Sequence, residues 1–224
     1  MRTQVKICGI SDAAALDAAL KAGADFVGFV FFQPSPRNVN LDEAMTLGAR
    51  VGKKVQKVAL TVDADDALHE NIIAALSPDI LQLHGTETPQ RVADVRGRYG
   101  LPVMKALAIG TKDDLAAIPG YAGVADWLLF DARPPRDATR PGGLGRSFDW
   151  TLLKALDPGL SFMLSGGLDR NNVAEAMAIT QAPAVDVSSG VESAPGVKDP
   201  AEIAAFVRAV RENDAEPARM ASTR

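Results

Sequence analysis

The sequence predicts a single-domain (β/α)8 barrel, and three observations carry that prediction. Eight short apolar segments alternate along the chain with segments that carry helix start and stop signals. The apolar segments are continuous rather than alternating in polarity, which is typical of strands buried on both faces of a parallel sheet. The length of 224 residues suits one α/β barrel. An open doubly wound sheet is the alternative, and it is disfavoured because no GxGxxG motif opens a helix after the first strand.

The predicted strands share β-branched and aromatic residues and end abruptly in polar residues or glycine. In chain order they lie at 5–10, 25–31, 57–62, 80–85, 103–107, 127–131, 161–165 and 184–188. Side chains alternate along a strand, so Lys6 and Cys8 share one face of the first strand and Val5 and Ile7 the other. A lysine and a thiol on one face are unusual for a plain core.

The helices are placed by their caps. The first is expected over 12–22, with Ser11 or Asp12 as its N-cap and Gly23 as a left-handed stop. Similar start signals follow at Asn40 with Glu43, Asp65, Thr88 with Pro89, Thr111 with Asp114, Asp169, and Asp199 with Pro200. These signals mark seven helix starts, and the alternation with eight strands leads us to expect eight helices, one for each strand.

The chain is expected to lose its regular structure near its end. From about Asn213 the sequence is polar and patternless, which is typical of a frayed terminus. The predicted organisation is a barrel over 1–212 and a flexible tail over 213–224, with no linker between domains.

Composition excludes several classes of protein. The net charge of −4 and the lack of a basic stripe with interleaved aromatics argue against nucleic-acid binding. The longest apolar run, at 26–32, is too short to span a bilayer, and the first residues leave no room for a signal peptide. A single cysteine fits a reducing compartment. We expect a cytoplasmic protein with no nucleic-acid or membrane partner, as a monomer with a dimer left open.

A metal centre is not expected either. The chain has two histidines and one cysteine, and no recognisable ligand spacing joins them.

Polar residues and glycines collect at the carboxyl ends of the predicted strands. They are Cys8, Arg37, His84, Asp131, the pair Gly166 and Gly167, and the run Ser188, Ser189 and Gly190. In a barrel these ends converge on one mouth, where α/β barrels place their active sites. The pattern predicts a single site there.

The loops after the seventh and eighth strands indicate an anion site. Glycines in these loops let backbone N–H groups approach an anion closely, and a helix N-terminus adds positive potential. This pair of loops is the recurrent phosphate site of barrels. The alternative is that Gly166-Gly167 and Ser189-Gly190 are only tight turns.

Cys8 and Asp131 can be interpreted as a base and an acid. A thiolate can take a proton from carbon, and a carboxylic acid can protonate an oxygen. Lys6, on the same face as Cys8, could favour the thiolate. The alternatives are that Cys8 is a small buried hydrophobic residue and that Asp131 caps a loop.

Three further residues have open roles. Asp186 could neutralise an inward lysine, Lys6 or Lys105, or contact a substrate. His84 could be a donor at the mouth or a structural histidine, and Gln82 on the same face is expected to be structural.

Arg37 also has an open role. It follows two prolines that stiffen its loop. Its guanidinium could clamp a carboxylate through two hydrogen bonds or simply be solvated.

Seven motifs resemble the phosphoribosylanthranilate isomerase family. They are VKICGI at 5–10, SPR at 35–37, QLHG at 82–85, LFD at 129–131, GLGRSFDW at 143–150, LSGGL at 164–168 and DVSSGVE at 186–192. The resemblance implies a (β/α)8 barrel that performs an Amadori rearrangement in tryptophan biosynthesis without metal or cofactor. It implies that Cys8 is the general base, Asp131 the general acid and Arg37 the ligand of the anthranilate carboxylate. Gly167 and the loop from Ser188 to Gly190 would hold the phosphate.

The sequence departs from the family pattern in three places. Leu144 stands where threonine is expected, Arg146 stands where lysine is usual, and 59–62 replaces a Gly-Val-Phe-like run.

Two sister barrels are alternatives to this family. Indole-glycerol-phosphate synthase would have a lysine acid and an extra N-terminal segment, and the histidine-pathway isomerase would have aspartate in place of Cys8. A catalytically dead phosphosugar-binding barrel is the non-enzymatic alternative.

Overall fold

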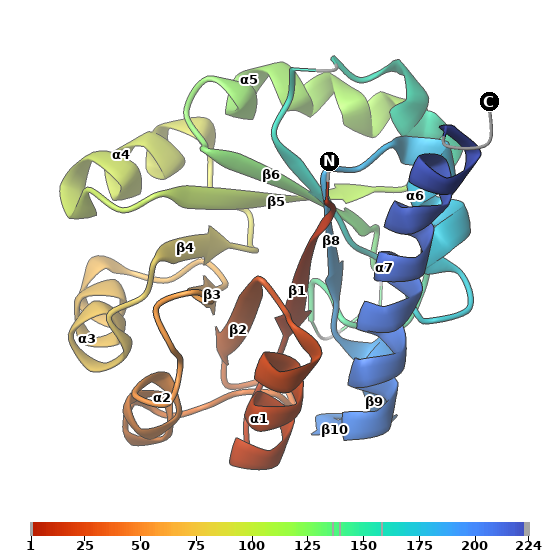
Figure 1. Ribbon diagram of the computed structural model, residues 1–224. Helices are drawn as coiled ribbons and strands as arrows, with labels where there is room; N and C mark the ends of the chain where they lie inside the picture. The colour runs from red at the N-terminus through yellow and green to blue at the C-terminus, as the bar shows by residue number, and fades with distance from the viewer. Residues whose placement is uncertain (1, 136, 139, 158, 222–224) are drawn as a thin grey trace.

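A closed parallel barrel forms the centre of the protein (Figure 1). The computed structural model describes residues 2–135, 137–138, 140–157 and 159–221. The barrel strands are β1 (Gln4–Cys8), β2 (Phe26–Phe31), β3 (Gln56–Thr61), β4 (Ile80–Leu83), β5 (Val103–Ile109), β6 (Trp127–Ala132), β7 (Phe162–Leu164) and β8 (Ala184–Val187). They pair in sequential order, and β8 closes on β1 with Lys6 opposite Asp186. The predicted single-domain barrel is confirmed, and the open sheet is excluded.

Helices surround the barrel in Figure 1. In the described part of the chain the α-helices are α1 (Ala13–Ala22), α2 (Leu41–Gly48), α3 (Asp66–Leu76), α4 (Pro89–Tyr99), α5 (Ile118–Ala122), α6 (Val173–Thr180) and α7 (Pro200–Ala221). The expectation of an eighth helix, between β6 and β7, was wrong. Where the structure describes that connection, its only helical segment is a 3₁₀ turn, Trp150–Ala155. Six of the fifteen residues at 132–146 are prolines or glycines, which disfavour an α-helix in this part of the connection.

The predicted caps are confirmed at most helix starts. The Asp12 side chain accepts the N–H of Ala15, Gly23 ends α1 at φ +85°, and Asn40 forms a capping box with Glu43. Helix α6 begins later than the expected Asp169. The Asp169 carboxylate accepts the N–H groups of Asn171 and Asn172, which holds this segment in a turn before the helix starts.

The apolar core has two layers. Side chains such as Val5 and Ile7 pack between the barrel and its helices. Eight other buried residues fill the barrel interior, namely Phe26, Val58, Ile80, Met104, Ala106, Leu129, Met163 and Ala184. Lys6 and Cys8 point inward as predicted, and Cys8 packs with Val30 and Leu60.

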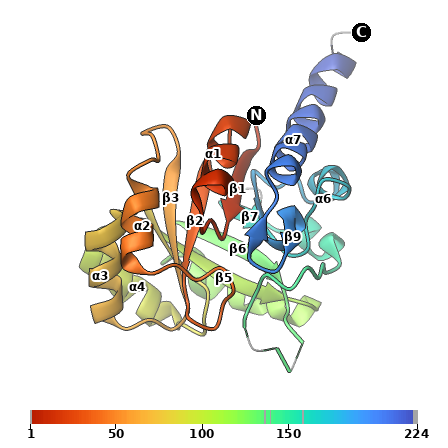
Figure 2. The ribbon, with the colours of Figure 1, turned by 90° about the horizontal axis from the view of Figure 1, so that it is seen from below.

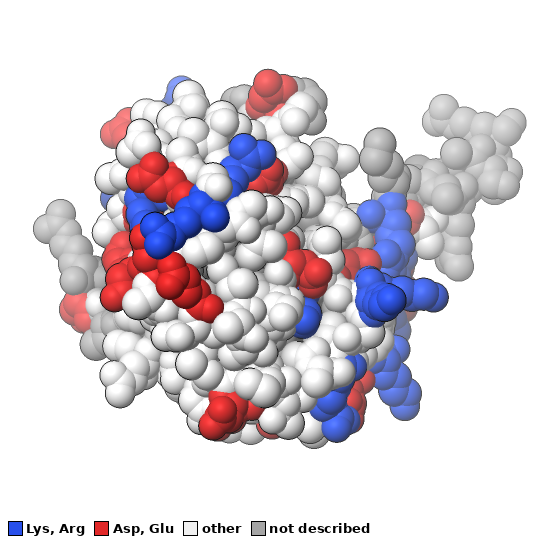
Figure 3. Space-filling model, turned by 90° about the vertical axis from the view of Figure 1, so that its left-hand side faces the viewer, with Lys and Arg blue, Asp and Glu red and all other residues white. Residues whose placement is uncertain are grey.

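The outer face over α3 and α4 carries mixed charge. Figure 3 shows basic and acidic side chains interspersed on this side of the molecule. Arg98 pairs with Asp66 and Glu70, and Arg91 pairs with Asp66, so these ion pairs join α4 to α3. The side chains of these pairs are 29–55% exposed, so each pair contributes little to stability. No helix in the described residues is both long enough and apolar enough to cross a membrane.

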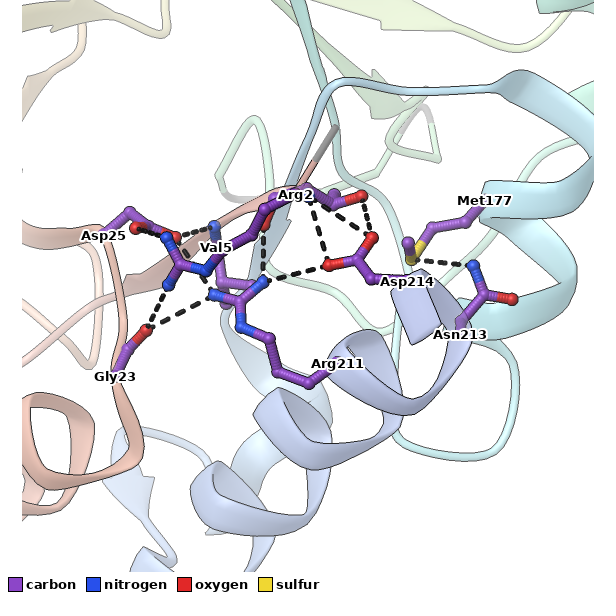
Figure 4. A network of polar contacts seen from close by, with 9 residues as sticks. Arg2, Val5, Gly23, Asp25, Met177, Arg211, Asn213 and Asp214 are labelled. Atoms are coloured by element: carbon purple, nitrogen blue, oxygen red, sulfur yellow. Dashed lines mark hydrogen bonds and ion pairs between the residues drawn. The ribbon is translucent and has the colours of Figure 1, made fainter. Parts of the chain in front are cut away.

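The expected tail from Asn213 is helical instead. Helix α7 continues to Ala221, and Figure 2 shows its far end extending past the barrel near the N-terminus. Asp214 accepts hydrogen bonds from the Thr3 backbone N–H and the Thr3 hydroxyl at 3.1 and 2.7 Å. Arg211 donates to the Thr3 carbonyl and to Asp25 (Figure 4). These contacts are long-range in sequence, so the local pattern could not reveal them. Residues 222–224 lie outside the described residues.

We expect Asp214→Ala to destabilise the fold, because the part-buried N–H and hydroxyl of Thr3 would lose their acceptor. The expected loss in the free energy of unfolding is about 1–2 kcal/mol. Urea denaturation measures it. A change below about 0.5 kcal/mol would show that these contacts with Thr3 contribute little to stability.

Candidate active site

A cavity at the carboxyl ends of the strands collects most of the predicted site residues. Its lining includes Cys8, Arg37, His84, Asp131, Gly166, Gly167, Asp186, Ser188 and Ser189. Lys6 and Gly190 do not line it. Lys6 is fully buried beneath it, and Gly190 packs against the Leu168 carbonyl so closely that a side chain would overlap it.

Cys8 lies beside Lys6 at the floor of the cavity. A Cβ on Gly28 would be 3.1 Å from the Cys8 Sγ and 3.2 Å from the Lys6 Nζ, so Gly28 leaves room for these two groups. Burial raises the pKa of Cys8, Lys6 lowers it and Asp186 opposes Lys6, and the net pKa lies above the ordinary value of 9.0. Lys6 lowers the pKa of Cys8, as expected, but burial raises that pKa by more.

Asp186 neutralises Lys6. The Lys6 Nζ is 2.8 Å from the Asp186 Oδ1, and the Ser165 hydroxyl donates to Oδ2. Of the two lysines that were possible partners of Asp186, Lys105 pairs with Glu87 instead, with 2.7 Å between the Lys105 Nζ and the Glu87 Oε2. Burial alone would lower the pKa of Lys6, but Asp186 and Cys8 more than offset it and raise that pKa.

The Asp131 carboxylate is bonded by the backbone N–H of the next residue and lies beside the His84 ring. Its Oδ1 accepts the N–H of Ala132 at 2.8 Å, and its Oδ2 lies 3.3 Å from the His84 Nε2. The His84 Nδ1 is 3.0 Å from the Gln82 Nε2. With the Gln82 amide assigned as the donor, neutral His84 carries its proton on Nε2, aimed at Asp131. His84 thus lies at the mouth, and Gln82 supports it from below.

Arg37 is not solvated. It is buried, and its Nε and Nη2 donate to the two carboxylate oxygens of Glu192 at 2.7 and 2.8 Å. The Nη2 also reaches the Gly143 carbonyl at 3.2 Å. Among the described residues no acceptor bonds the Arg37 Nη1. Glu192 lies in the DVSSGVE motif but was not predicted as a site residue, because nothing local in the sequence links it to Arg37.

The glycines after β7 have backbone geometry that suits an anion. Gly166 and Gly167 have φ of +88° and +65°, which β-branched residues strongly disfavour. Within the described residues, the backbone N–H groups of Gly166, Gly167 and Leu168 bond no other backbone group outside the regular elements. Ser188 and Ser189 face the same cavity from the loop after β8.

The loop after β6 folds over the mouth. A Cβ on Gly142 would be 2.5 Å from the Asp131 Oδ2 and 2.9 Å from the His84 Nε2. A Cβ on Gly143 would be 2.5 Å from the Arg37 Nη1. These glycines therefore let the loop backbone reach the polar groups of the site. Positions 136 and 139 of this loop lie outside the described residues.

Comparisons with known proteins agree on one family. The family model described as N-(5'phosphoribosyl)anthranilate (PRA) isomerase matches residues 5–209. An N-(5'-phosphoribosyl)anthranilate isomerase from Bradyrhizobium diazoefficiens is 62% identical over 94% of this chain and 95% of its own length.

The chain belongs to the phosphoribosylanthranilate isomerase family.

Two solved structures of this isomerase are also similar. A phosphoribosylanthranilate isomerase in complex with reduced 1-(o-carboxyphenylamino)-1-deoxyribulose 5-phosphate has a TM-score of 0.82 and 28% identity, covering 94% of this chain and 99% of that chain. Monomers generated from the dimeric isomerase of Thermotoga maritima have the same TM-score, identity and coverage. The monomer expected here stays a prediction.

Membership in the phosphoribosylanthranilate isomerase family answers two questions left open by the sequence. The chain is an isomerase of tryptophan biosynthesis, so the sister-barrel and non-catalytic alternatives are set aside.

In the described residues, no group of three or more potential ligand side chains gathers where it could hold a metal ion.

Proposed function

We propose that the chain catalyses the Amadori rearrangement of N-(5-phosphoribosyl)anthranilate to 1-(2-carboxyphenylamino)-1-deoxyribulose 5-phosphate. Cys8 is the general base and Asp131 the general acid. One observation carries the proposal: a thiol and a carboxyl group line one cavity, together with Arg37 and the glycines after β7. These groups match the proton transfers, the carboxylate and the phosphate that this reaction requires.

The proposed reaction needs one proton transferred to the substrate and one proton removed from it. Asp131 protonates the furanose ring oxygen, and the ring opens to a Schiff base. The Cys8 thiolate removes the proton from C2′ and leaves an enolamine, which tautomerises to the ketone. The product is an isomer of the substrate, and proton exchange with solvent returns Cys8 and Asp131 to their starting states.

The geometry indicates which oxygen of Asp131 donates. Oδ1 is engaged by the Ala132 N–H, whereas Oδ2 faces His84 and the cavity. We assign the transferred proton to Oδ2, with His84 holding that oxygen in place. Arg37 and the loops after β7 and β8 would hold the carboxylate and phosphate ends of the substrate.

The test of the proposed function is direct turnover. Phosphoribosylanthranilate is fluorescent, so its conversion by the purified protein can be followed as loss of fluorescence. Absence of turnover by a folded protein would contradict the proposal.

We expect the thiolate of Cys8 to increase with pH through the neutral range. Burial raises the pKa of Cys8, so the thiol form predominates at neutral pH, and each unit of pH should increase the thiolate about tenfold below that pKa. The ultraviolet absorbance of the thiolate, taken as the difference between the unaltered protein and Cys8→Ala, measures this fraction independently of the protonation of Asp131. A thiolate fraction already complete between about pH 7 and pH 8.5 would contradict the raised pKa.

A further inference from the structure

A short hairpin lies behind the active site and was not expected from the sequence. Strands β9 (Glu192–Ala194) and β10 (Val197–Lys198) follow β8 and precede α7. They pair antiparallel with Glu192 opposite Lys198. Both side chains are buried, at 4% and 0% exposure, and neither lines the cavity. A buried ion pair beside an active site, but outside its lining, can act only through the groups that it holds.

The Glu192 carboxylate is fully engaged. It accepts two hydrogen bonds from Arg37, one from the Lys198 Nζ at 2.6 Å and one from the Gly196 N–H at 3.2 Å. Burial alone would raise the pKa of Glu192, but Arg37 and Lys198 more than offset it, so that pKa lies below its ordinary value. The carboxylate is therefore ionised at neutral pH.

Lys198 connects this carboxylate to the loop after β8. Its Nζ donates to the Ser188 carbonyl at 2.8 Å and approaches the Ser188 hydroxyl at 3.2 Å. On the other side, the hairpin turn packs on the Arg37 loop, because a Cβ on Gly196 would overlap the Pro36 carbonyl. One chain of contacts thus runs from Arg37 through Glu192 and Lys198 to Ser188.

We propose that Glu192 is a positioning residue that couples the carboxylate-binding end of the site, at Arg37, to the phosphate-binding loop, at Ser188. The proposal rests on the proposed function, which places these two ends of the substrate. Because Glu192 occupies the Nε and Nη2 edge of Arg37, the substrate carboxylate must bind the outer edge, which carries Nη1. Glu192 thereby determines which edge of the guanidinium is left to bind the substrate carboxylate.

The charge balance makes the role testable. Glu192 is an anion between Arg37 and Lys198; burial lowers the pKa of Lys198, and Glu192 opposes that effect. Removing the charge of Glu192 alone would make the site less negative and favour phosphate binding. Loss of positioning has the opposite effect, because Lys198 and Ser188 would lose their fixed geometry. The sign of the change in phosphate affinity therefore separates a positioning role from a purely electrostatic one.

The experiment compares Glu192→Gln and Glu192→Asp with the unaltered protein. Calorimetry measures the Kd of inorganic phosphate, and the fluorescence assay gives KM and kcat. We expect both variants to bind phosphate about tenfold more weakly and to show a similar rise in KM with a smaller change in kcat. Glu192→Asp keeps the charge but is too short to span Arg37 and Lys198 together, so it also covers the case in which Glu192→Gln does not fold. Asp214→Ala is the matched control, since it breaks an ionic network at the opposite end of the barrel.

A double-variant cycle tests the coupling itself. If Glu192 couples the two ends, Arg37→Lys should itself weaken the binding of inorganic phosphate, and its combination with Glu192→Asp should weaken that binding no further, whereas independent roles would multiply the two effects. Multiplied effects, or phosphate affinity that is unchanged or tighter in folded Glu192→Gln and Glu192→Asp, would overturn the proposal. Phosphate binding does not depend on turnover. An unaltered protein without isomerase activity would therefore refute the proposed function, while weaker phosphate binding by the variants would still support the coupling.

Discussion

Cys8→Ala should lower kcat by at least about 10²–10⁴-fold, the usual contribution of a positioned general base. The thiol is buried next to Lys6 and Asp186, and within the described residues no other cysteine exists to replace it. Loss of one sulfur atom should change the free energy of unfolding by only about 1 kcal/mol. Fluorescence assays measure kcat, and urea denaturation measures stability.

Two controls separate the roles of Cys8. Phosphate affinity should be unchanged in Cys8→Ala, because the loops after β7 and β8 are untouched. Cys8→Ser should lose about as much kcat as Cys8→Ala, since a hydroxyl group does not ionise at neutral pH and cannot replace the thiolate as the base. Near-normal turnover in Cys8→Ala would refute its role as the base.

Asp131→Asn should have a comparable effect for a different reason. The asparagine oxygen can still accept the Ala132 N–H, so the side chain keeps its place. An amide cannot donate the acid proton, and kcat should fall by about 10²–10⁴-fold. Steady-state assays measure the loss, and the Kd of inorganic phosphate should stay at the value of the unaltered protein.

The outcome for binding decides between two roles of Asp131. If phosphate binding and thermal stability fell as far as kcat, Asp131 would be a structural residue that holds His84 and Ala132. A fall in kcat with intact binding would assign it to the chemistry. Comparison with His84→Gln, which removes the imidazole beside Oδ2, shows how much of the effect depends on the orientation of the carboxyl group.

Most of the fold could be predicted from local sequence. The N-cap Asp12, the stop at Gly23 and the capping box of Asn40 with Glu43 depend on contacts within one or two helical turns. Continuous apolar strands indicated a parallel sheet, and the eightfold alternation indicated closure. Cys8 and Asp131 could be singled out because strand ends in a closed barrel must meet at one mouth.

The sequence by itself therefore determined the order of strands, the barrel and the residues that face its mouth, since these follow from spacing along the chain. Only the tertiary structure decided which charges pair. Arg37 and Glu192 are 155 residues apart, and Asp214 reaches Thr3 across 211. It also decided that burial raises the pKa of Cys8 despite the nearby lysine. Ion pairing and desolvation depend on distance and depth after the barrel closes, and no local pattern encodes either quantity.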